Sequence, residues 1–304
     1  MSEIIYFDRR TKTEEKEKVY GQSFLELLYG NGILARCFSF LLRPLFAKIP
    51  LLSRLYGGIQ KSRISRCKIK PFIQTFKVDS SEFLDSVGSF TSFNDFFIRR
   101  LNPQCRPITS GRDVAVFPAD ARYLVFPNID QADGFWVKGK KFSLPTFLQN
   151  EALAARYAKG AMAIARLCPI DYHRFHFPCA CTAGKAHLIN GPLYSVNPIA
   201  LKQNIEYLSE NKRMVTLLKT EDFGDVLSVE IGATYVGSIH QTYAPENSYA
   251  KGDEKGYFAF GGSCLILLFE PGKIIFDQDL IDYSAKKMEV RGLLGDSLGR
   301  APIR

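Results

Sequence analysis

The sequence Phe258-Ala-Phe-Gly-Gly-Ser-Cys-Leu-Ile-Leu-Leu-Phe-Glu270 places two glycines and a serine directly before a continuous apolar run. Gly261 and Gly262 allow a sharp turn and a close approach by other groups, because glycine carries no Cβ. The run after Ser263 is typical of a buried β-strand. A Gly-Gly-Ser turn before a strand is common, so this stretch alone predicts a turn and a strand. It also lacks the Gly-x-Ser-x-Gly spacing of the α/β-hydrolase nucleophile.

The chain around this run is also typical of β-structure. From Val114 onward, short segments rich in β-branched and aromatic residues recur between Gly, Pro and Asn. Two helices are predicted as well, one at Pro145–Tyr157 and a short one within Thr91–Arg100, with Ser92 or Asn94 as its N-cap. We therefore expect an α+β fold with a β-rich catalytic core, similar to a barrel-sandwich, over residues 71–304. The predicted strands are Val114–Phe117, Tyr123–Phe126, Phe135–Val137, Val226–Ile231, Tyr235–Ile239, Tyr257–Phe260, Leu265–Phe269 and Lys273–Phe276.

Residues 1–70 are predicted to form a separate helical segment. The 304 residues are enough for one large domain with an appendage, or for two domains. A content of 46% hydrophobic and 23% charged residues is ordinary for a globular protein. This composition excludes disorder, collagen and coiled coil as the main architecture. Met1–Lys18 is charged and lacks the apolar core of a secretory signal.

The positive charge is concentrated in one window of the chain. Residues 36–70 hold nine Lys or Arg and no acid, which equals the net charge of +9 of the whole protein. The window is apolar between its charges, and Pro44 and Pro50 limit any helix to short pieces. Short basic amphipathic pieces can lie in the headgroup plane of an anionic membrane, so residues 1–70 are predicted to associate with membranes. The alternative is a helical hairpin packed on the protein's own core.

Two of the four histidines supply candidate catalytic groups. His173 and His176 lie in Asp171-Tyr-His-Arg-Phe-His-Phe-Pro178. Histidine is the usual general base near neutral pH, although a packed histidine pair would have the same sequence. A zinc site would need a convincing third ligand, which the sequence does not supply. The seven cysteines are odd in number and lack a repeated spacing, so reduced thiols are expected instead of a disulfide framework.

Asp120 adds an acid to these groups. It ends Phe117-Pro-Ala-Asp120, a tight turn after a predicted strand, and taken alone it is typical of a turn residue. Asp120, His176 and Ser263 together supply an acid, a base and a hydroxyl, which are the groups that activate a nucleophile. The sequence does not show that they meet in space.

At these positions the chain resembles the phosphatidylserine decarboxylases, self-processing pyruvoyl enzymes of bacterial and organellar membranes. The resemblance runs from about Thr91 to Leu268. Two positions depart from the family's pattern, since Cys264 stands where threonine is usual and Ala121 where glycine is usual. The resemblance consists of seven blocks in the family's order: SFNDFFIRRLNPQCRPI (92–108), FPAD (117–120), VKGKKFSLPTFL (137–148), DYHRFHFP (171–178), YSVNP (194–198), IGATYVGSI (231–239) and KGDEKGYFAFGGS (251–263).

The resemblance implies that the chain cuts itself between Gly262 and Ser263. Asp120 would orient His176, and His176 would take the proton from Ser263. The Ser263 oxygen would attack the Gly262 carbonyl, and elimination and hydrolysis would leave a pyruvoyl group at position 263. The products would be a β chain, 1–262, and an α chain, 263–304, held together as a heterodimer. Higher homo-oligomers are left open.

The same resemblance implies decarboxylation of phosphatidylserine to phosphatidylethanolamine and CO₂. The pyruvoyl carbonyl would form a Schiff base with the substrate's amine and act as an electron sink, while His173 would assist decarboxylation or reprotonation. Neither a metal nor pyridoxal phosphate is expected. The implied partners are phosphatidylserine and an anionic membrane surface, with no nucleic acid. The implied location is peripheral, on the cytoplasmic face of a bacterial inner membrane.

The residues alone leave other functions open. A zinc-dependent hydrolase on a β core would use His173 and His176 as ligands. A non-catalytic, lipoyl-like module would bind lipid or a partner and would not need Ser263. A nucleic-acid binder would use residues 36–70, and a sister decarboxylase would act on a related serine lipid.

Overall fold

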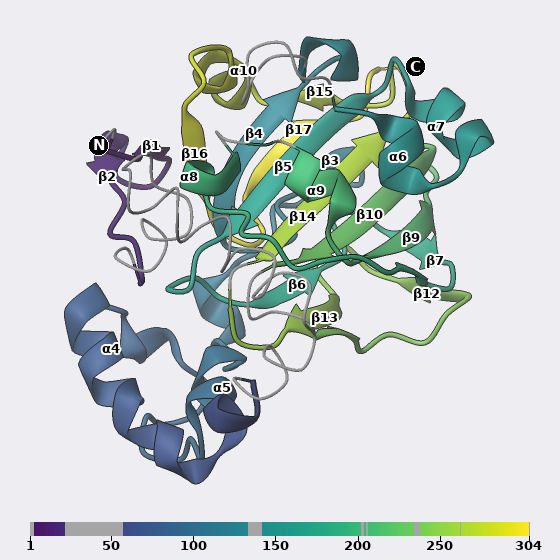
Figure 1. The fold of residues 1–304 in the computed structure, drawn as a ribbon. Helices are drawn as coiled ribbons and strands as arrows, with labels where there is room; N and C mark the ends of the chain where they lie inside the picture. Colours follow the sequence, from purple (N-terminus) through teal and green to yellow (C-terminus); the bar gives the residue numbers. More distant parts are fainter. Residues whose placement is uncertain are drawn as a thin grey trace, which may run out of the picture.

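The computed structural model describes residues 3–21, 57–132, 142–201, 204, 206–233, 238–261 and 263–303. Within these residues, strands form a sheet-rich core with helices around it, which confirms the predicted α+β class (Figure 1). No helix in the described part of the chain has the length and apolarity needed to cross a bilayer. Four predicted features lie wholly or mostly outside the described residues: the strand at 135–137, the strand at 235–239, Gly262, and the basic window before residue 57.

Eleven of the described strands form one sheet. Their order is β12-β7-β9-β10-β14-β5-β4-β16-β1-β2, and β8 also pairs with β9. β1 pairs with β16 in parallel, whereas β14 is antiparallel to both of its neighbours, β5 and β10. The strands of this sheet are β1 (Ile5–Asp8), β2 (Thr13–Lys16), β4 (Ala121–Phe126), β5 (Ala161–Leu167), β7 (Cys181–Ala183), β8 (His187–Ile189), β9 (Arg213–Lys219), β10 (Asp225–Gly232), β12 (Asn247–Tyr249), β14 (Ser263–Phe269) and β16 (Glu289–Gly292).

Two three-stranded sheets and several short helices complete the described structure. One small sheet has the order β11-β13-β6, and the other β15-β17-β3. Their strands are β3 (Val114–Val116), β6 (Arg174–His176), β11 (Ile239–Gln241), β13 (Glu254–Phe258), β15 (Ile275–Phe276) and β17 (Ser297–Arg300). The α-helices are α4 (Ile69–Phe76), α5 (Phe93–Phe97), α6 (Leu144–Leu148), α7 (Glu151–Tyr157), α8 (Pro198–Leu201), α9 (Glu206–Glu210) and α10 (Gln278–Ala285).

β14 is buried on both of its faces, which explains its unbroken apolar sequence. Leu265, Leu267 and Phe269 enter one hydrophobic core, while Cys264, Ile266 and Leu268 enter a second core. Helices α6 to α9 contribute to the second core. Successive side chains of a strand point to opposite faces, so both cores fix the position of this strand. Ser263, its first residue, is therefore held in the interior of the molecule.

An aromatic lobe around α4 and α5 lies at the end of the core where β6 and β13 are found (Figure 1). α5 begins after Ser92, whose Oγ accepts a hydrogen bond from the Asp95 amide (3.1 Å), as predicted for the N-cap. Phe93 and Phe97 of this helix pack edge-to-face against Phe260. This contact joins the lobe to the chain just before Ser263.

Two predictions about secondary structure are wrong. Residues 1–70 do not begin as helix, because β1 and β2 form a hairpin that joins the main sheet through β16. The strand that joins this hairpin to the main sheet, β16, lies at the other end of the chain, so no local pattern could have indicated that pairing. Pro145–Tyr157 is two helices, because Gln149 adopts a left-handed conformation (φ 49°) and Asn150 caps α7. The domain boundary at residue 70 stays a prediction.

Candidate active site

Ser263 lies at the start of β14 with its side chain fully buried. Its backbone is in register with Leu167 of β5 on one side and Gly232 of β10 on the other. The Ser263 Oγ lies 3.5 Å from Nδ1 of His173. The predicted nucleophile is thus held by a central strand beside one of the two predicted histidines.

His173 is held in one protonation state by the loop that carries it. Its Nε2 lies 2.9 Å from the Cys168 carbonyl oxygen, which can only accept, so Nε2 carries the proton. Nδ1 is then free to accept the Ser263 hydroxyl. The ring stacks on Phe97 of α5, with centroids 3.8 Å apart. Burial, and secondarily the charge of Arg99, lower the pKa of His173 to about 3, so the ring is neutral at physiological pH.

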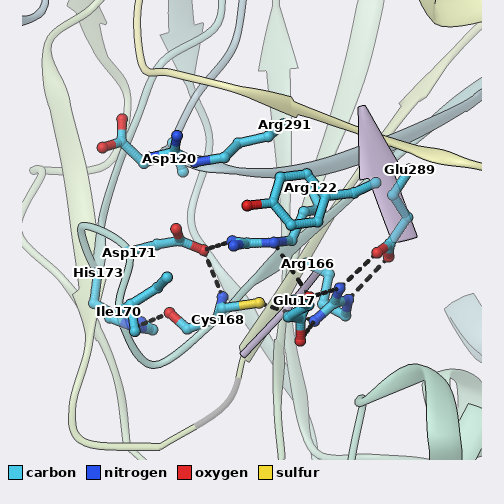
Figure 2. A network of polar contacts seen from close by, with 12 residues as sticks. Glu17, Asp120, Arg122, Arg166, Cys168, Ile170, Asp171, His173, Glu289 and Arg291 are labelled. Carbon is cyan, nitrogen blue, oxygen red and sulfur yellow. Dashed lines mark hydrogen bonds and ion pairs between the residues drawn. The ribbon is translucent and has the colours of Figure 1, made fainter. Parts of the chain in front are cut away.

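A buried network of ion pairs holds the loop between β5 and β6 that carries His173 (Figure 2). The Asp171 carboxylate accepts from the Cys168 amide (2.7 Å) and from Arg122 of β4. Arg122 lies 3.3 Å from Glu17, and Glu17 also pairs with Arg166 of β5. Burial opposes the ionisation of Glu17, but Arg166 and Arg122 prevail and lower its pKa to about 2. The loop is therefore tied to the N-terminal segment and to two central strands.

His176 ends β6 and makes no hydrogen bond to Ser263 in the described structure. Its Nδ1 donates to the Gly252 carbonyl oxygen (2.9 Å), which leaves Nε2 as a bare acceptor. Nε2 is buried and has no hydrogen-bond partner among the described residues. Burial lowers the pKa of His176, whereas the Gly252 carbonyl, Glu254 and Asp120 raise it in part. A buried nitrogen that lacks a partner is unusual in native proteins, and here it belongs to a predicted catalytic group.

Asp120 lies near His176 but does not orient it through a hydrogen bond. The Asp120 oxygens accept from the Arg106 guanidinium, at 2.7 to 3.1 Å, and from the Leu294 amide at 2.8 Å. The His176 amide donates to Pro118, so the two segments are neighbours. The hydrogen bond that orients the His176 ring goes to the Gly252 carbonyl oxygen and not to Asp120. The charge of Asp120 raises the pKa of His176 in part, and its role in catalysis stays a prediction.

Several residues of the site were missed at the level of sequence: Glu17, Arg99, Arg106, Arg122, Arg166 and Glu289. Arg122 and Arg166 carry a visible signal, because each is a charged residue inside an otherwise apolar strand. Buried charges need partners, so acids at a distance were implied, although not which ones. Glu17 lies in a polar, N-terminal stretch without any such signal.

The described residues contain no group of three or more His, Cys, Asp or Glu arranged to hold a metal ion. His173 and His176 in particular direct their donated hydrogen bonds to different backbone carbonyls, those of Cys168 and Gly252. The six cysteines in the described segments are free thiols. The geometry at Ser263 is that of a buried hydroxyl beside a neutral imidazole, which can activate an oxygen nucleophile.

Comparison with known proteins gives one consistent result. The sequence model of the phosphatidylserine decarboxylase family matches residues 93–292. A phosphatidylserine decarboxylase proenzyme of Chlamydia pneumoniae is 48% identical over 296 residues, covering 97% of each chain. Proteins of the same name from Chlamydia felis and from Chlamydia trachomatis serovar L2 are 49% and 46% identical. The first covers 99% of both chains, and the second covers 98% of this chain and 97% of its own.

Proposed function

This chain belongs to the phosphatidylserine decarboxylase family and decarboxylates phosphatidylserine to phosphatidylethanolamine, and we propose that its catalytic group is a pyruvoyl made from Ser263. The relatives are named proenzymes, which implies self-processing. The observation that carries the position of the cut is the buried Ser263 hydroxyl next to His173, at the residue that follows Gly262. The products are a β chain of residues 1–262 and an α chain of residues 263–304.

The processing reaction is an attack of Ser263 on the preceding peptide bond. Ser263 Oγ bonds to the carbonyl carbon of Gly262, and the amide C–N bond breaks as its nitrogen gains a proton, which leaves an ester. β-Elimination then releases a chain that ends in the Gly262 carboxylate. The dehydroalanine that remains takes up water and releases ammonia. A serine hydroxyl is a poor nucleophile until a base removes its proton.

His176 is the base in this proposal. The Nε2 of His176 is unprotonated and has no partner among the described residues, and Glu254 and Asp120 favour the imidazolium that forms when the proton arrives. His173 is nearer to the hydroxyl, but burial and Arg99 hold its pKa near 3, so it retains a proton poorly. The Ser263 hydroxyl must then leave His173 before cleavage. His173 stays beside residue 263 and handles a proton there during decarboxylation.

The residues around position 263 fit a pyruvoyl group. Ser263 and His173 are fully buried, and the neutral His173 ring stacks on Phe97 of α5. Once formed, the pyruvoyl group supplies an electron sink for the carbon that loses CO₂. The task of the chain is then to exclude water, to orient the substrate and to place the His173 Nδ1 beside the reacting carbon.

We also propose that the protein is a peripheral membrane protein at the cytoplasmic face of a bacterial inner membrane. The described part of the basic window supports this, because Ile59 and Ile64 are 55% and 83% exposed among five exposed basic residues, Lys61, Arg63, Arg66, Lys68 and Lys70. Each basic residue near an anionic surface contributes about 1 kcal/mol. Replacing all five by glutamine should weaken sedimentation with phosphatidylglycerol vesicles more than about tenfold and leave cleavage unchanged. Arg112→Gln with Arg300→Gln is the matched control, and equal binding by both proteins would reject membrane docking by this segment.

Intact mass under denaturing conditions tests the processing proposal. Freshly purified protein should give two chains, the smaller being the last 42 residues less one ammonia. The Ser263→Ala protein should give one chain of full length without decarboxylase activity. A single uncut chain in wild-type protein that decarboxylates phosphatidylserine would overturn the assignment of Ser263.

A further inference from the structure

A cavity of about 330 Å³ lies next to the candidate active site. Its wall is made by the β1–β2 hairpin, the segment from Phe76 to Phe83, and the loop from Ile170 to Tyr172. Asp120 and Arg106 also line it. The residue after Tyr172 is His173, which contacts Ser263. The cavity therefore shares Asp120 with the candidate site, and its wall residue Tyr172 directly precedes His173.

Arg99 contributes an unneutralised cation to this cavity. The residue is 5% exposed, and its guanidinium carbon lies 5.0 Å from the ring centroids of both Phe83 and Phe96. Nη2 donates to the carbonyls of Ile170 and Asp171 (3.2 and 3.3 Å). Nε and Nη1 have no hydrogen-bond partner in the described part of the chain. Two buried N–H groups of this guanidinium thus lack a hydrogen-bond acceptor among the described residues.

The acids of the cavity are already engaged. Asp120 and Glu82 accept from Arg106, and Asp171 accepts from Arg122. Glu15 accepts from the Tyr6 hydroxyl, and Asp79 from Ser81. By contrast, the Tyr172 hydroxyl and the Lys77 ammonium, both on the cavity wall, make no hydrogen bond or ion pair with any described residue. The unused groups are donors, so the cavity is complementary to an anion.

We propose that this cavity binds the phosphodiester of the phospholipid headgroup, with Arg99 and Tyr172 as the donors that contact its oxygens. A guanidinium presents donors in a plane that matches an oxyanion. In a serine phospholipid only two carbons and one oxygen separate the amine from the phosphorus, so a phosphate beside Tyr172 leaves the amine close to residue 263. The inference rests on the proposed function, because it takes the substrate from there.

The test measures binding without chemistry. Ser263→Ala protein, which cannot form a pyruvoyl group, is titrated with water-soluble glycerophosphoserine in a calorimeter. We expect saturable binding that Arg99→Gln weakens about tenfold or more and that Arg112→Gln, an exposed arginine paired with Glu221 and Asp222, leaves unchanged. A failure of processing in wild-type protein would leave this result untouched, so the two proposals can fail separately.

The choice of probe identifies the group that is recognised. Glycerophosphoethanolamine should bind within about threefold of glycerophosphoserine, and free serine should not compete, because the phosphodiester is what both glycerol compounds share. Competition by serine together with no binding of glycerophosphoethanolamine would overturn the proposal in favour of a carboxylate site. Binding of inorganic phosphate as tight as that of glycerophosphoserine would overturn it in favour of a free-phosphate site.

Arg99 also holds the loop at Ile170 and Asp171, so its replacement could disturb the fold. If Arg99→Gln lowers the melting temperature markedly, Tyr172→Phe and Lys77→Gln carry the test, since neither side chain has a hydrogen bond to lose among the described residues. Each should weaken glycerophosphoserine binding by about threefold to tenfold. Unchanged binding in both of these variants would reject the cavity as the headgroup site.

Discussion

Burial lowers the pKa of both histidines of the site, and the charges beside them then act in opposite directions. At His173 the neighbouring charge is Arg99, which lowers the pKa further. At His176 the neighbouring charges are Glu254 and Asp120, which raise the pKa, while Arg174 lowers it. His173 and His176, two histidines three positions apart, are thereby suited to different steps of the proposed reaction. The two carboxylates partly oppose the lowering of the His176 pKa, whereas the charge beside His173 adds to the lowering.

This difference predicts separable variants. His176→Ala should remain uncleaved, because His173, which lies beside Ser263, has a pKa of about 3 and retains a proton poorly. His173→Ala should be cleaved and then fail in decarboxylation. Intact mass and release of CO₂ measure the two steps. His240→Ala, which removes a ring that stacks on Tyr257, is the control and should be normal in both steps. An uncleaved His173→Ala beside a cleaved His176→Ala would assign the base to His173.

The charge of Asp120 can be tested apart from its structural role. Asp120→Asn keeps the size of the side chain but removes the charge that favours the His176 imidazolium, so cleavage should slow by about tenfold or more. Arg106 keeps its ion pair with Glu82. Glu82→Gln removes that other pair and should change the cleavage rate less than about twofold. Equal rates for the two variants, followed by gel over time, would deny Asp120 a role in processing.

One buried carboxylate, that of Asp171, ties the loop between β5 and β6 to β4. Asp171 holds both the Cys168 amide and Arg122, and its side chain is 2% exposed. Asp171→Asn should lower the free energy of unfolding by about 3–5 kcal/mol, because it leaves Arg122 without part of its counter-charge. It should also impair decarboxylation more than it impairs cleavage, since the loop positions His173.

Asp113→Asn is the control for this variant. It breaks the ion pair between Asp113 and Arg300, whose side chains are 52% and 62% exposed, respectively. Exposed pairs of this kind contribute about 0–1 kcal/mol. Chemical denaturation of the two uncleaved Ser263→Ala derivatives compares them. A loss below about 1 kcal/mol for Asp171→Asn would show that the loop is held by other contacts.

Elements with a local cause could be predicted from the sequence, and elements with a distant cause could not. β14 is visible as an apolar run, and α5 is visible through its Ser92 cap. β1 forms a hairpin with β2, but it joins the main sheet only because β16 pairs with it from the far end of the chain. The candidate residues Ser263 and His173 do meet, but nothing in their sequence indicates that Asp120 is occupied by Arg106. The hydrogen bonds of a buried side chain depend on which neighbours the fold brings to it.

At the scale of the molecule, two distant segments of the chain pair with one cation, Arg166 of β5. Glu17 comes from the N-terminal segment and Glu289 from β16 near the C-terminus. Glu17 has a pKa of about 2 in the folded protein against 4.5 for the free group. Its contribution, roughly 3 kcal/mol, is therefore complete above about pH 4.5 and is lost as the pH falls towards 2. Stability of the Ser263→Ala chain should fall across this interval.

Glu17→Gln should be less stable at pH 7 and should lose less on acidification. Glu3→Gln removes an exposed ion pair with Lys16. Its free energy of unfolding should stay within about 0.5 kcal/mol of that of the parent at both pH values. Urea denaturation of the parent chain and the two variants at pH 7 and pH 3 gives the six values needed. Parallel losses in Glu17→Gln and in the parent chain would mean that another carboxylate controls acid stability.

β14 lies between β5 and β10, and it begins at the proposed cut. Before the cut, this strand reaches its place as part of one molecule, and the rate at which it does so is independent of concentration. Afterwards, residues 263–304 are a separate molecule, and a denatured mature enzyme can recover only when two chains collide. Its recovery should then be second order and should fail on dilution. Maturation therefore removes the route by which the fold was first reached, and each protein molecule folds in that way only once.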